Sequence, residues 1–372
     1  MRTPIMYISS LQLFSMMMLF EFGSATVIGL GTEARQSSWV VVLLGMLLYL
    51  PVFYVICSLY KKETTSFPQL LSSVLGKHLG LVITFLYGLY FFYIGARVLR
   101  DFNELLLLTS LQGTPAFFVS LMMMSAVCYA CILKIEVIAR ASSLLFFVFL
   151  IFLAVGFGLI FFSQILDPRH LLPLLEPNGI NTIWHATFPT VVTFPFGEMI
   201  VLFCYAHYLK KPSRVKKTGI VALIVSAVIL SSIEMINMSA LGPYIARIAS
   251  IPLLVTFQLV NIGDIIQRMD VIVIAILMIG GFVKITLFMY AAVLCFKEIY
   301  RVEEETKLII PLGIATIALG HFMANTYIRH LQIGLEIIPM YVHIPAQIII
   351  PLLLVIVYKS KQMLLRRKQL SL

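Results

Sequence analysis

The stretch FPFGE at residues 194–198 lies in the middle of an apolar run that is bounded by His185 and His207. Its proline would remove a backbone hydrogen bond from a helix, and its glycine tolerates non-helical angles. Its glutamate carries a carboxylate that needs polar partners in such apolar surroundings. We therefore expect the helix around residues 194–198 to be interrupted.

The composition indicates that the solvent around most of this chain is lipid. The chain has 372 residues, of which 60% are hydrophobic and 12% are charged, and its mean hydropathy is +1.01. A soluble protein of this length could not cover so much apolar surface with polar side chains. The basic residues behind the net charge of +10 sit in short loops between apolar runs, not on one water-facing patch, which argues against binding to nucleic acid.

Ten apolar stretches are long enough, at about 20 residues, to cross a hydrocarbon core of roughly 30 Å. They cover approximately residues 8–30, 38–59, 80–110, 115–133, 141–163, 183–207, 218–239, 269–297, 307–325 and 339–358. We expect an all-α polytopic membrane protein with a first five-helix repeat at residues 1–165, an extracytoplasmic loop at 166–182, a second repeat at 183–358 and a basic cytoplasmic tail at 359–372. Residues 242–263 are apolar but carry two prolines and an arginine, so we expect a loop helix there, with an eleventh span as the alternative.

Lysine and arginine are distributed unequally between the two sets of loops. An N-terminus inside the cell assigns 19 of the 27 to the cytoplasmic face and 5 to the other face, and 3 remain within spans. Cytoplasmic loops are enriched in these residues. We therefore expect both termini on the cytoplasmic side.

The opening span has a milder version of the same interruption, at Gly23, Ser24, Ala25 and Thr26. This span and the one that contains residues 194–198 each open a five-span half of the chain. Helices that break at corresponding positions of two halves aim their ends and unpaired backbone groups at a ligand in transporters. A proline kink or a close-packed glycine set would explain either break alone, but together they favour a site for a small polar ligand near the membrane midplane.

Several sequence motifs along the chain support a more specific interpretation. They are FPFGE at residues 194–198, the opening span with Gly23 and Ser24, RDFNELL from Arg100, Thr114 with Pro115, and IEVIARASSLL from Ile135. Together they resemble the spore germinant receptor B subunits, a family within the amino acid, polyamine and organocation permease superfamily. The resemblance implies a five-plus-five inverted repeat like the leucine transporter fold, residence in the inner membrane of a dormant spore, and assembly with A and C subunits.

Ionisable side chains within the expected spans must face inward and find partners. If all eight of these side chains faced lipid, their exposure to the hydrocarbon would cost on the order of 20 kcal/mol, which is more than the net stability of a typical domain. In the third span, Arg97 with Asp101 and Arg100 with Glu104 are spaced i to i+4, so each pair is expected to neutralise itself on one helix face. The eight residues are Glu21, Arg97, Arg100, Asp101, Glu104, Glu198, Glu234 and Lys284.

Three of these charges have alternative roles. Arg97, with Tyr93 one turn away, could clasp a ligand carboxylate. Glu198 could bind a ligand ammonium, carry a proton or cap freed backbone amides. Lys284 lies about 200° around its helix from Thr286, so it could occupy the place where related transporters bind sodium, or pair with Glu21 or Glu234.

The expected ligand-binding residues come from the two breaks, the third span and the eighth span. They are Gly23, Ser24, Ala25, Thr26, Tyr93, Arg97, Phe194, Phe196, Gly197, Glu198, Thr286 and Tyr290, with Lys284 and Asp101 as ion-site mimics or structural charges.

No nucleophile elbow, HExxH helix or phosphate-cradling loop occurs in the sequence, so we expect neither an enzyme nor a cofactor. His185, His321 and His343 have no partner at metal-ligand spacing, and we expect no metal. Two functions share the remaining architecture: a ligand-sensing receptor subunit, or an amino-acid permease, with proton coupling as an option. The resemblance favours a germinant receptor subunit that binds a small germinant, with an amino acid as the expected class, and signals to A and C subunits.

Overall fold

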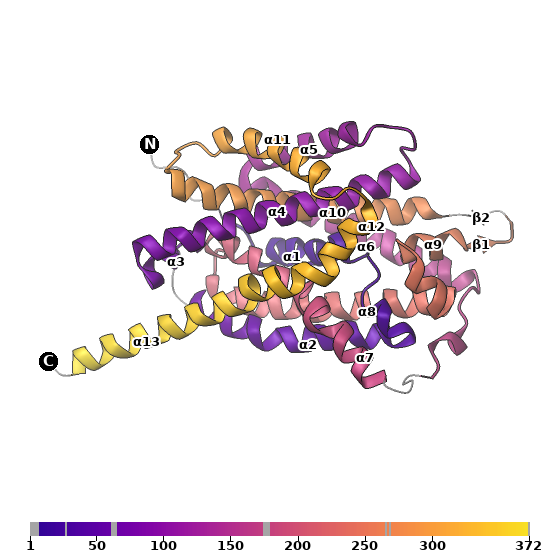
Figure 1. Ribbon diagram of the computed structural model, residues 1–372, viewed down its shortest axis with the longest axis horizontal. Coiled ribbons are helices and arrows are strands. Elements are labelled where there is room, and N and C mark those ends of the chain that lie inside the picture. Colours follow the sequence, from indigo (N-terminus) through magenta and orange to yellow (C-terminus); the bar gives the residue numbers. More distant parts are fainter. Residues whose placement is uncertain are drawn as a thin grey trace.

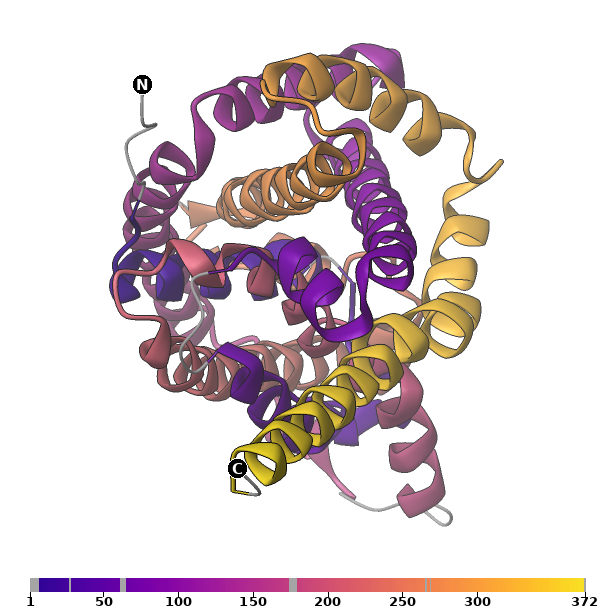
Figure 2. The same cartoon turned by 90° about the vertical axis from the view of Figure 1, so that its left-hand side faces the viewer.

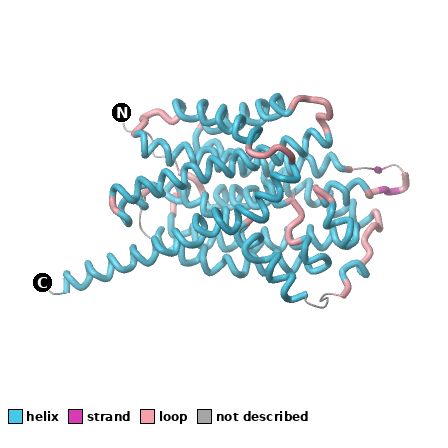
Figure 3. The backbone as a smooth tube through the Cα atoms, in the orientation of Figure 1, coloured by secondary structure: helices cyan, strands magenta, loops and turns pink. Residues whose placement is uncertain are grey.

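The long apolar runs of this chain form long helices, and the computed structural model describes residues 7–26, 28–60, 65–173, 179–264, 266–267 and 269–370 (Figures 1 and 3). The α-helices are α1 (Ser10–Ala25), α2 (Ser38–Ile56), α3 (Phe67–Leu75), α4 (Lys77–Thr109), α5 (Ala116–Ile132), α6 (Lys134–Phe162), α7 (Gly179–Ala186), α8 (Val215–Ile248), α9 (Pro252–Gln258), α10 (Asp270–Tyr300), α11 (Thr306–Phe322), α12 (Tyr327–Gln332) and α13 (Ile350–Leu370). A short hairpin pairs β1 (Asn261–Ile262) with β2 (Ile266–Gln267).

Shorter 3-10 and π segments connect or interrupt these helices. They are η1 (Thr32–Ser37), η2 (Cys57–Tyr60), η3 (Pro168–Leu171), η4 (Thr187–Val191), η5 (Phe196–Tyr208), η6 (Pro212–Arg214), η7 (Ile333–Ile337) and η8 (Pro339–Ile349).

All ten expected spans fall on helical segments. Within the described residues, seven helical stretches are long and apolar enough to cross a membrane, and an eighth arises if α11 and the segment Tyr327–Ile337, bent by 107°, count as one span. The remaining two spans correspond to α1 and α5, which have 16 and 17 residues and are shorter than the usual requirement of about 20. The prediction of an all-α polytopic membrane protein is confirmed.

Helix α10 lies inside the bundle, surrounded by other helices when the molecule is viewed along the helix axes (Figure 2). Residues 283–293 of this helix are all buried. At Gly280 this helix packs closely against α1, because a Cβ added to Gly280 would lie 2.9 Å from the Cα of Gly23. Two glycines therefore allow the backbones of α1 and α10 to approach closely at the centre of the fold.

The loops gather at two opposite ends of the bundle (Figure 3). At one end, the chain start pairs with the end of η5, since Ile8 donates its N–H to the carbonyl of Tyr208 at 2.8 Å. Helix α13 projects from the bundle at this same end (Figure 1). At the other end, Nε2 of Gln36 donates to the carbonyl of Pro173 at 2.7 Å. The first residues of the chain, and the side chains from Leu365 onward in the basic tail, lie outside the described part.

Residues 242–263, expected to form one loop helix, form two helical pieces instead. Helix α8 continues to Ile248 through a break at Gly242, whose φ is +73°, and α9 follows as a separate helix. Glycine tolerates this left-handed angle at little cost, so the helix can change direction there.

Candidate functional site

The first helix break lies later than predicted, because Gly23, Ser24 and Ala25 are still helical and the break follows the end of α1. Helix α1 ends at Ala25, and the Thr26 hydroxyl donates to the carbonyl of Phe22 at 2.7 Å. Beyond the break, the N–H of Leu30 donates to Oε1 of Glu234 on α8 at 2.9 Å. A buried backbone N–H without a partner would be costly, so this carboxylate compensates for the loss of helical hydrogen bonds.

The second break is longer than the FPFGE stretch that predicted it. Phe188 leaves the helical conformation at φ −116° and ψ 128°, and regular helix then gives way to the π segment η4 and, after Pro195, to the 3-10 segment η5. The Thr193 hydroxyl donates to the carbonyl of Pro189 at 3.0 Å, and the N–H of Glu198 donates to the carbonyl of Pro195 at 3.1 Å. The predicted interruption is present, and two prolines contribute to it.

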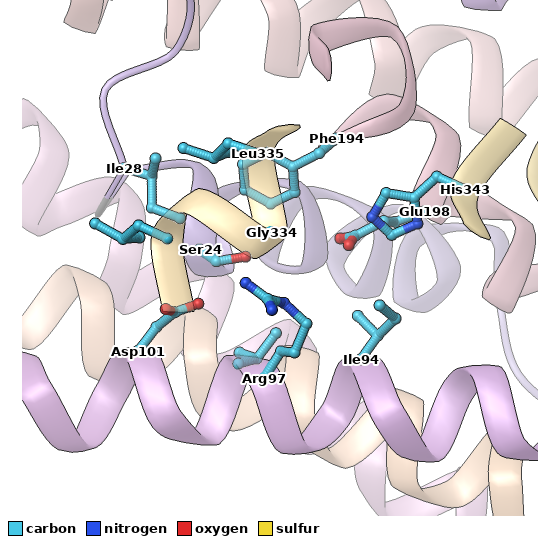
Figure 4. Close-up of a pocket in the computed structure, with 12 residues that line it drawn as sticks. Ser24, Ile28, Ile94, Arg97, Asp101, Phe194, Glu198, Gly334, Leu335 and His343 are labelled. Carbon is cyan, nitrogen blue, oxygen red and sulfur yellow. The ribbon is translucent and has the colours of Figure 1, made fainter. Parts of the chain in front are cut away.

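A small cavity of about 30 Å³ lies between the two breaks and α4 (Figure 4). Its polar side chains are Arg97 and Asp101 of α4, Glu198 of the second break, Ser24 at the end of α1, and His343 of the last span. Its walls are formed by Ser24, Ile28, Ile94, Arg97, Val98, Asp101, Phe194, Glu198, Leu331, Gly334, Leu335 and His343. The structure therefore brings together elements that are far apart in the sequence around one polar space.

Lys284 forms an ion pair with Glu198, with 2.6 Å between Nζ and Oε2. The Nζ atom also lies 4.9 Å from the ring centroid of Phe20 and 5.0 Å from that of Phe194. Of the two alternatives for Lys284, a pair with Glu21 or Glu234 is not formed, since its partner is Glu198. Glu234 is engaged at the first break, and neither carboxylate oxygen of Glu21 has a hydrogen-bond partner in the described part of the chain.

The expected pairing within α4 was also wrong. Asp101 accepts a hydrogen bond from Nε2 of His330 at 2.9 Å, while Nη2 of Arg97 donates to the backbone carbonyl of His330 at 2.8 Å. Among the described ion pairs, none joins Arg97 to Asp101 or Arg100 to Glu104. Arg97 and Asp101 therefore find their partners on another segment and not along the same helix.

Four of the twelve expected ligand-binding residues line the cavity: Ser24, Arg97, Phe194 and Glu198. Asp101, expected as an ion-site mimic or structural charge, lines it as well. Tyr93 stands behind Arg97, with its hydroxyl 3.4 Å from Nη1.

The other expected residues lie away from the cavity. Gly23 packs against Lys284, and Gly197 packs against Gln347. Ala25, Thr26 and Phe196 are buried and are absent from the walls of the cavity.

The hydroxyls expected from the eighth span also have other partners. Thr286 donates to the carbonyl of Phe282 within α10 at 2.7 Å. Tyr290 donates to Oε2 of Glu305 at 2.9 Å, and Glu305 also pairs with Lys297 at 2.7 Å. These two hydroxyls share a helix face but do not reach the polar space at the breaks.

Sequence reasoning missed the histidines that contact this site. His330 lies in the short segment between two spans, and His343 lies inside the last span, where it is buried and contacts the Tyr90 hydroxyl at 2.8 Å. Gln347 donates to the same hydroxyl at 2.7 Å. The i to i+4 spacing of His343 and Gln347 was a usable signal, but His330 had none, because its partners come from α4.

Metal binding and disulfide chemistry find little support in the described residues. Within that part of the chain, no group of three His, Cys, Asp or Glu side chains could hold a metal ion. All five cysteines are free and buried.

The fold is that of the leucine transporter class. The crystal structure of MhsT in complex with L-phenylalanine superposes with a TM-score of 0.64 at 15% identity, covering 95% of this chain and 89% of that one. The substrate-bound, outward-open structure of a Na⁺-coupled sialic acid symporter superposes with a TM-score of 0.65 at 14% identity, covering 90% and 79% of the two chains. At these identities the likeness concerns the fold alone.

The amino-acid sequence is similar to proteins of spore germination. Residues 7–328 match the family model described as spore germination protein. Spore germination protein KB of Bacillus subtilis (strain 168) is 36% identical over 358 residues, covering 95% of this chain and 96% of the relative. Spore germination protein YndE of the same organism is 25% identical over 283 residues, covering 73% and 74%. The chain belongs to the spore germination protein family, and it is a permease-like integral membrane protein.

Proposed function

We propose that this protein is the nutrient-sensing membrane subunit of a spore germinant receptor. It binds a small germinant in the cavity between the two helix breaks and signals to A and C subunits. The observation that carries this proposal is that Arg97 and Glu198, from α4 and the second break, line the same buried cavity. The names of the relatives, all spore germination proteins, support the biological role.

An amino acid fits the charges around the cavity. The guanidinium of Arg97 can bind a carboxylate through two parallel hydrogen bonds. Lys284 contacts Oε2 of Glu198 at 2.6 Å. The other carboxylate oxygen of Glu198 can accept a hydrogen bond from a ligand ammonium. The complex of MhsT with L-phenylalanine supports an amino acid as the ligand of a protein with this fold.

The placement in the membrane follows from the same reasoning. We propose that residues 1–165 and 183–358 form two repeats of five helices, each opened by a broken helix, and that the protein resides in the inner membrane of the spore. The excess of lysine and arginine at the end where the chain starts and α13 projects supports a cytoplasmic or core-side position of both termini. The tail from residue 359 continues α13 to Leu370 on that side.

An amino-acid permease is the second candidate, because the fold is shared with a Na⁺-coupled symporter. Binding at the breaks is common to a sensor and a carrier, and only alternating access makes a carrier. Reconstitution in liposomes separates the two candidates. Uptake of a labelled amino acid at carrier rates, with no dependence on partner subunits, would replace the sensor with the permease.

The ligand proposal is tested with Arg97→Ala. We expect this variant to raise the nutrient concentration for half-maximal germination by about tenfold or more, since a hydrogen bond to a charged group contributes about 1.5–3 kcal/mol. The matched control is Arg140→Ala, which removes an exposed arginine paired with Glu136 on α6. Equal nutrient sensitivity of Arg97→Ala and the control, at equal protein levels, would exclude Arg97 from ligand binding.

A binding screen identifies the ligand class. Thermal unfolding of the purified receptor complex is measured with single amino acids and with sugars, because a ligand that binds only the folded state raises the melting temperature. We expect stabilisation by at least one amino acid in wild type and its loss in Arg97→Ala. Stabilisation by sugars alone would overturn the assignment of an amino acid.

A further inference from the structure

The segment Tyr327–Ile337, formed by α12 and η7, covers the cavity, and we call it the lid. It turns away from α11 by 107°, so it runs across the bundle rather than continuing the span. Leu331, Gly334 and Leu335 of the lid form part of the cavity wall, together with Arg97 and Glu198. Figure 4 shows Arg97 and Asp101 pointing from α4 toward Ser24 and Gly334. The lid therefore forms one wall of the cavity.

A buried polar contact fastens the lid to α4. The side chains of His330 and Asp101 are 0% and 6% exposed, and Nε2 and Oδ1 are 2.9 Å apart. The ring of Tyr327 lies nearly parallel to that of His330, with centroids 5.9 Å apart. A buried hydrogen bond with a carboxylate is among the stronger non-covalent contacts, and it is costly to break on one side only.

The same histidine also holds Arg97 in place. Its backbone carbonyl accepts a hydrogen bond from Nη2 of Arg97 at 2.8 Å. Gly334 makes room for this arrangement, because a Cβ on Gly334 would overlap Nη2. The guanidinium that faces the cavity is thus bound to the backbone of the lid.

The second helix break reaches the lid as well. The hydroxyl of Thr190 donates to the carbonyl of Leu335 at 3.1 Å. The lid is therefore tied to α4 at one end and to the broken sixth span at the other.

The cavity beside the lid has room only for water. A volume of about 30 Å³ is enough for one or two water molecules. Entry of an amino acid therefore requires the lid or the Arg97 side chain to move, and these two groups are joined through His330.

We propose that His330 and Asp101 form a latch that holds the lid closed, and that His330 is the positioning residue of Arg97. A ligand carboxylate and the carbonyl of His330 then compete for the same guanidinium, so ligand binding loosens the lid from α4. This inference rests on the proposed function in one respect: the covered cavity is the ligand site.

Cysteine accessibility tests the latch without any ligand. Ser24→Cys places a thiol on the cavity wall, and the five native cysteines are buried. The rate of its reaction with a water-soluble maleimide is measured on the full-length protein in membrane vesicles. We expect His330→Ala to raise this rate about tenfold or more, because the latched state loses a buried hydrogen bond.

The matched control is Ser120→Ala, which removes a buried hydrogen bond between Asn103 of α4 and Ser120 of α5 at 2.6 Å without touching the lid. If His330→Ala does not fold, Thr190→Val removes the second lid contact with little change of shape and is expected to give a smaller rise. Equal maleimide rates in the lid variants and in Ser120→Ala would overturn the latch.

The latch and the assignment of the cavity as the ligand site can be contradicted independently of each other. The maleimide rate is measured without nutrient, so an unchanged rate contradicts the latch and leaves the germination result of Arg97→Ala standing. A raised rate, together with unchanged nutrient sensitivity in Arg97→Ala, supports the latch and contradicts the ligand assignment.

Discussion

Nζ of Lys284 lies 2.6 Å from Oε2 of Glu198, and the two side chains are 0% and 4% exposed. The pair joins α10, at the centre of the bundle, to the break that opens the second half of the chain. Each charge offsets the other where water is excluded, and each would be costly alone. Lys284 therefore supplies a cation that belongs to the protein, directly beside the cavity.

Breaking this pair on one side destabilises the protein. Lys284→Met leaves Glu198 buried without its partner, which costs about 3–5 kcal/mol. The double variant Lys284→Met with Glu198→Leu removes both charges and is expected to recover most of that loss. Thermal unfolding of the purified protein in detergent is measured for Lys284→Met, Glu198→Leu and the double variant. If the double variant loses as much stability as the two single variants together, the two residues do not act as a pair.

Gly23 is required for the close approach of α1 and α10. A Cβ at this position would lie 2.8 Å from both Cβ and Cδ of Lys284 and 3.0 Å from the carbonyl of Gly280. We expect Gly23→Ala to lose about 1–3 kcal/mol through overpacking. Gly158→Ala on α6 is the matched control, because its Cβ would meet nothing within 4 Å. Equal melting temperatures for the two variants would contradict the packing role.

Glu234 caps the first helix break. Its Oε1 accepts the N–H of Leu30 at 2.9 Å. Glu234→Leu leaves that N–H without a partner and is expected to cost about 1–3 kcal/mol, whereas Glu234→Gln keeps an acceptor oxygen and stays closer to wild type. Melting temperatures of the two variants check the order. A Leu variant as stable as the Gln variant would rule out capping as the role of this side chain.

We expect Tyr290 to stabilise the C-terminal half of α10 through its hydrogen bond to Glu305. Tyr290→Phe removes its hydrogen bond to Glu305, which is buried and also paired with Lys297. We expect a loss of about 1.5–3 kcal/mol in stability, since the acceptor is charged, with no change in the nutrient concentration for half-maximal germination. A rise in that concentration at normal protein levels would return Tyr290 to the binding site.

The helix breaks could be predicted because their causes are local. The prolines and glycine of residues 188–197 disrupt helical hydrogen bonding wherever the segment lies. In the first span Gly23 and Ser24 remain helical, and the break comes only after α1 ends at Ala25. The number of spans was also predictable, since the length of an apolar run depends on the thickness of the bilayer.

The partners of the buried charges could not be predicted from spacing. Asp101 has Arg97 one turn away, yet it bonds to His330, which lies 229 positions further along the chain. Sequence reasoning offered Glu21 and Glu234, in the first and seventh spans, as partners of Lys284. The structure pairs Lys284 with Glu198 in the sixth span. Spacing along one helix says which residues share a face, but it does not say which helix packs against that face.

By itself the sequence determined a helical membrane protein, its approximate spans and the two interrupted helices that line its site, because hydropathy and backbone breakers act locally. Only the tertiary structure decided that Glu198 of the FPFGE stretch forms an ion pair with Lys284 and that Arg97 is bound to the lid. It also decided that Thr286 and Tyr290 lie away from the cavity. These contacts depend on how helices cross, and each joins segments that come together only when the bundle is packed.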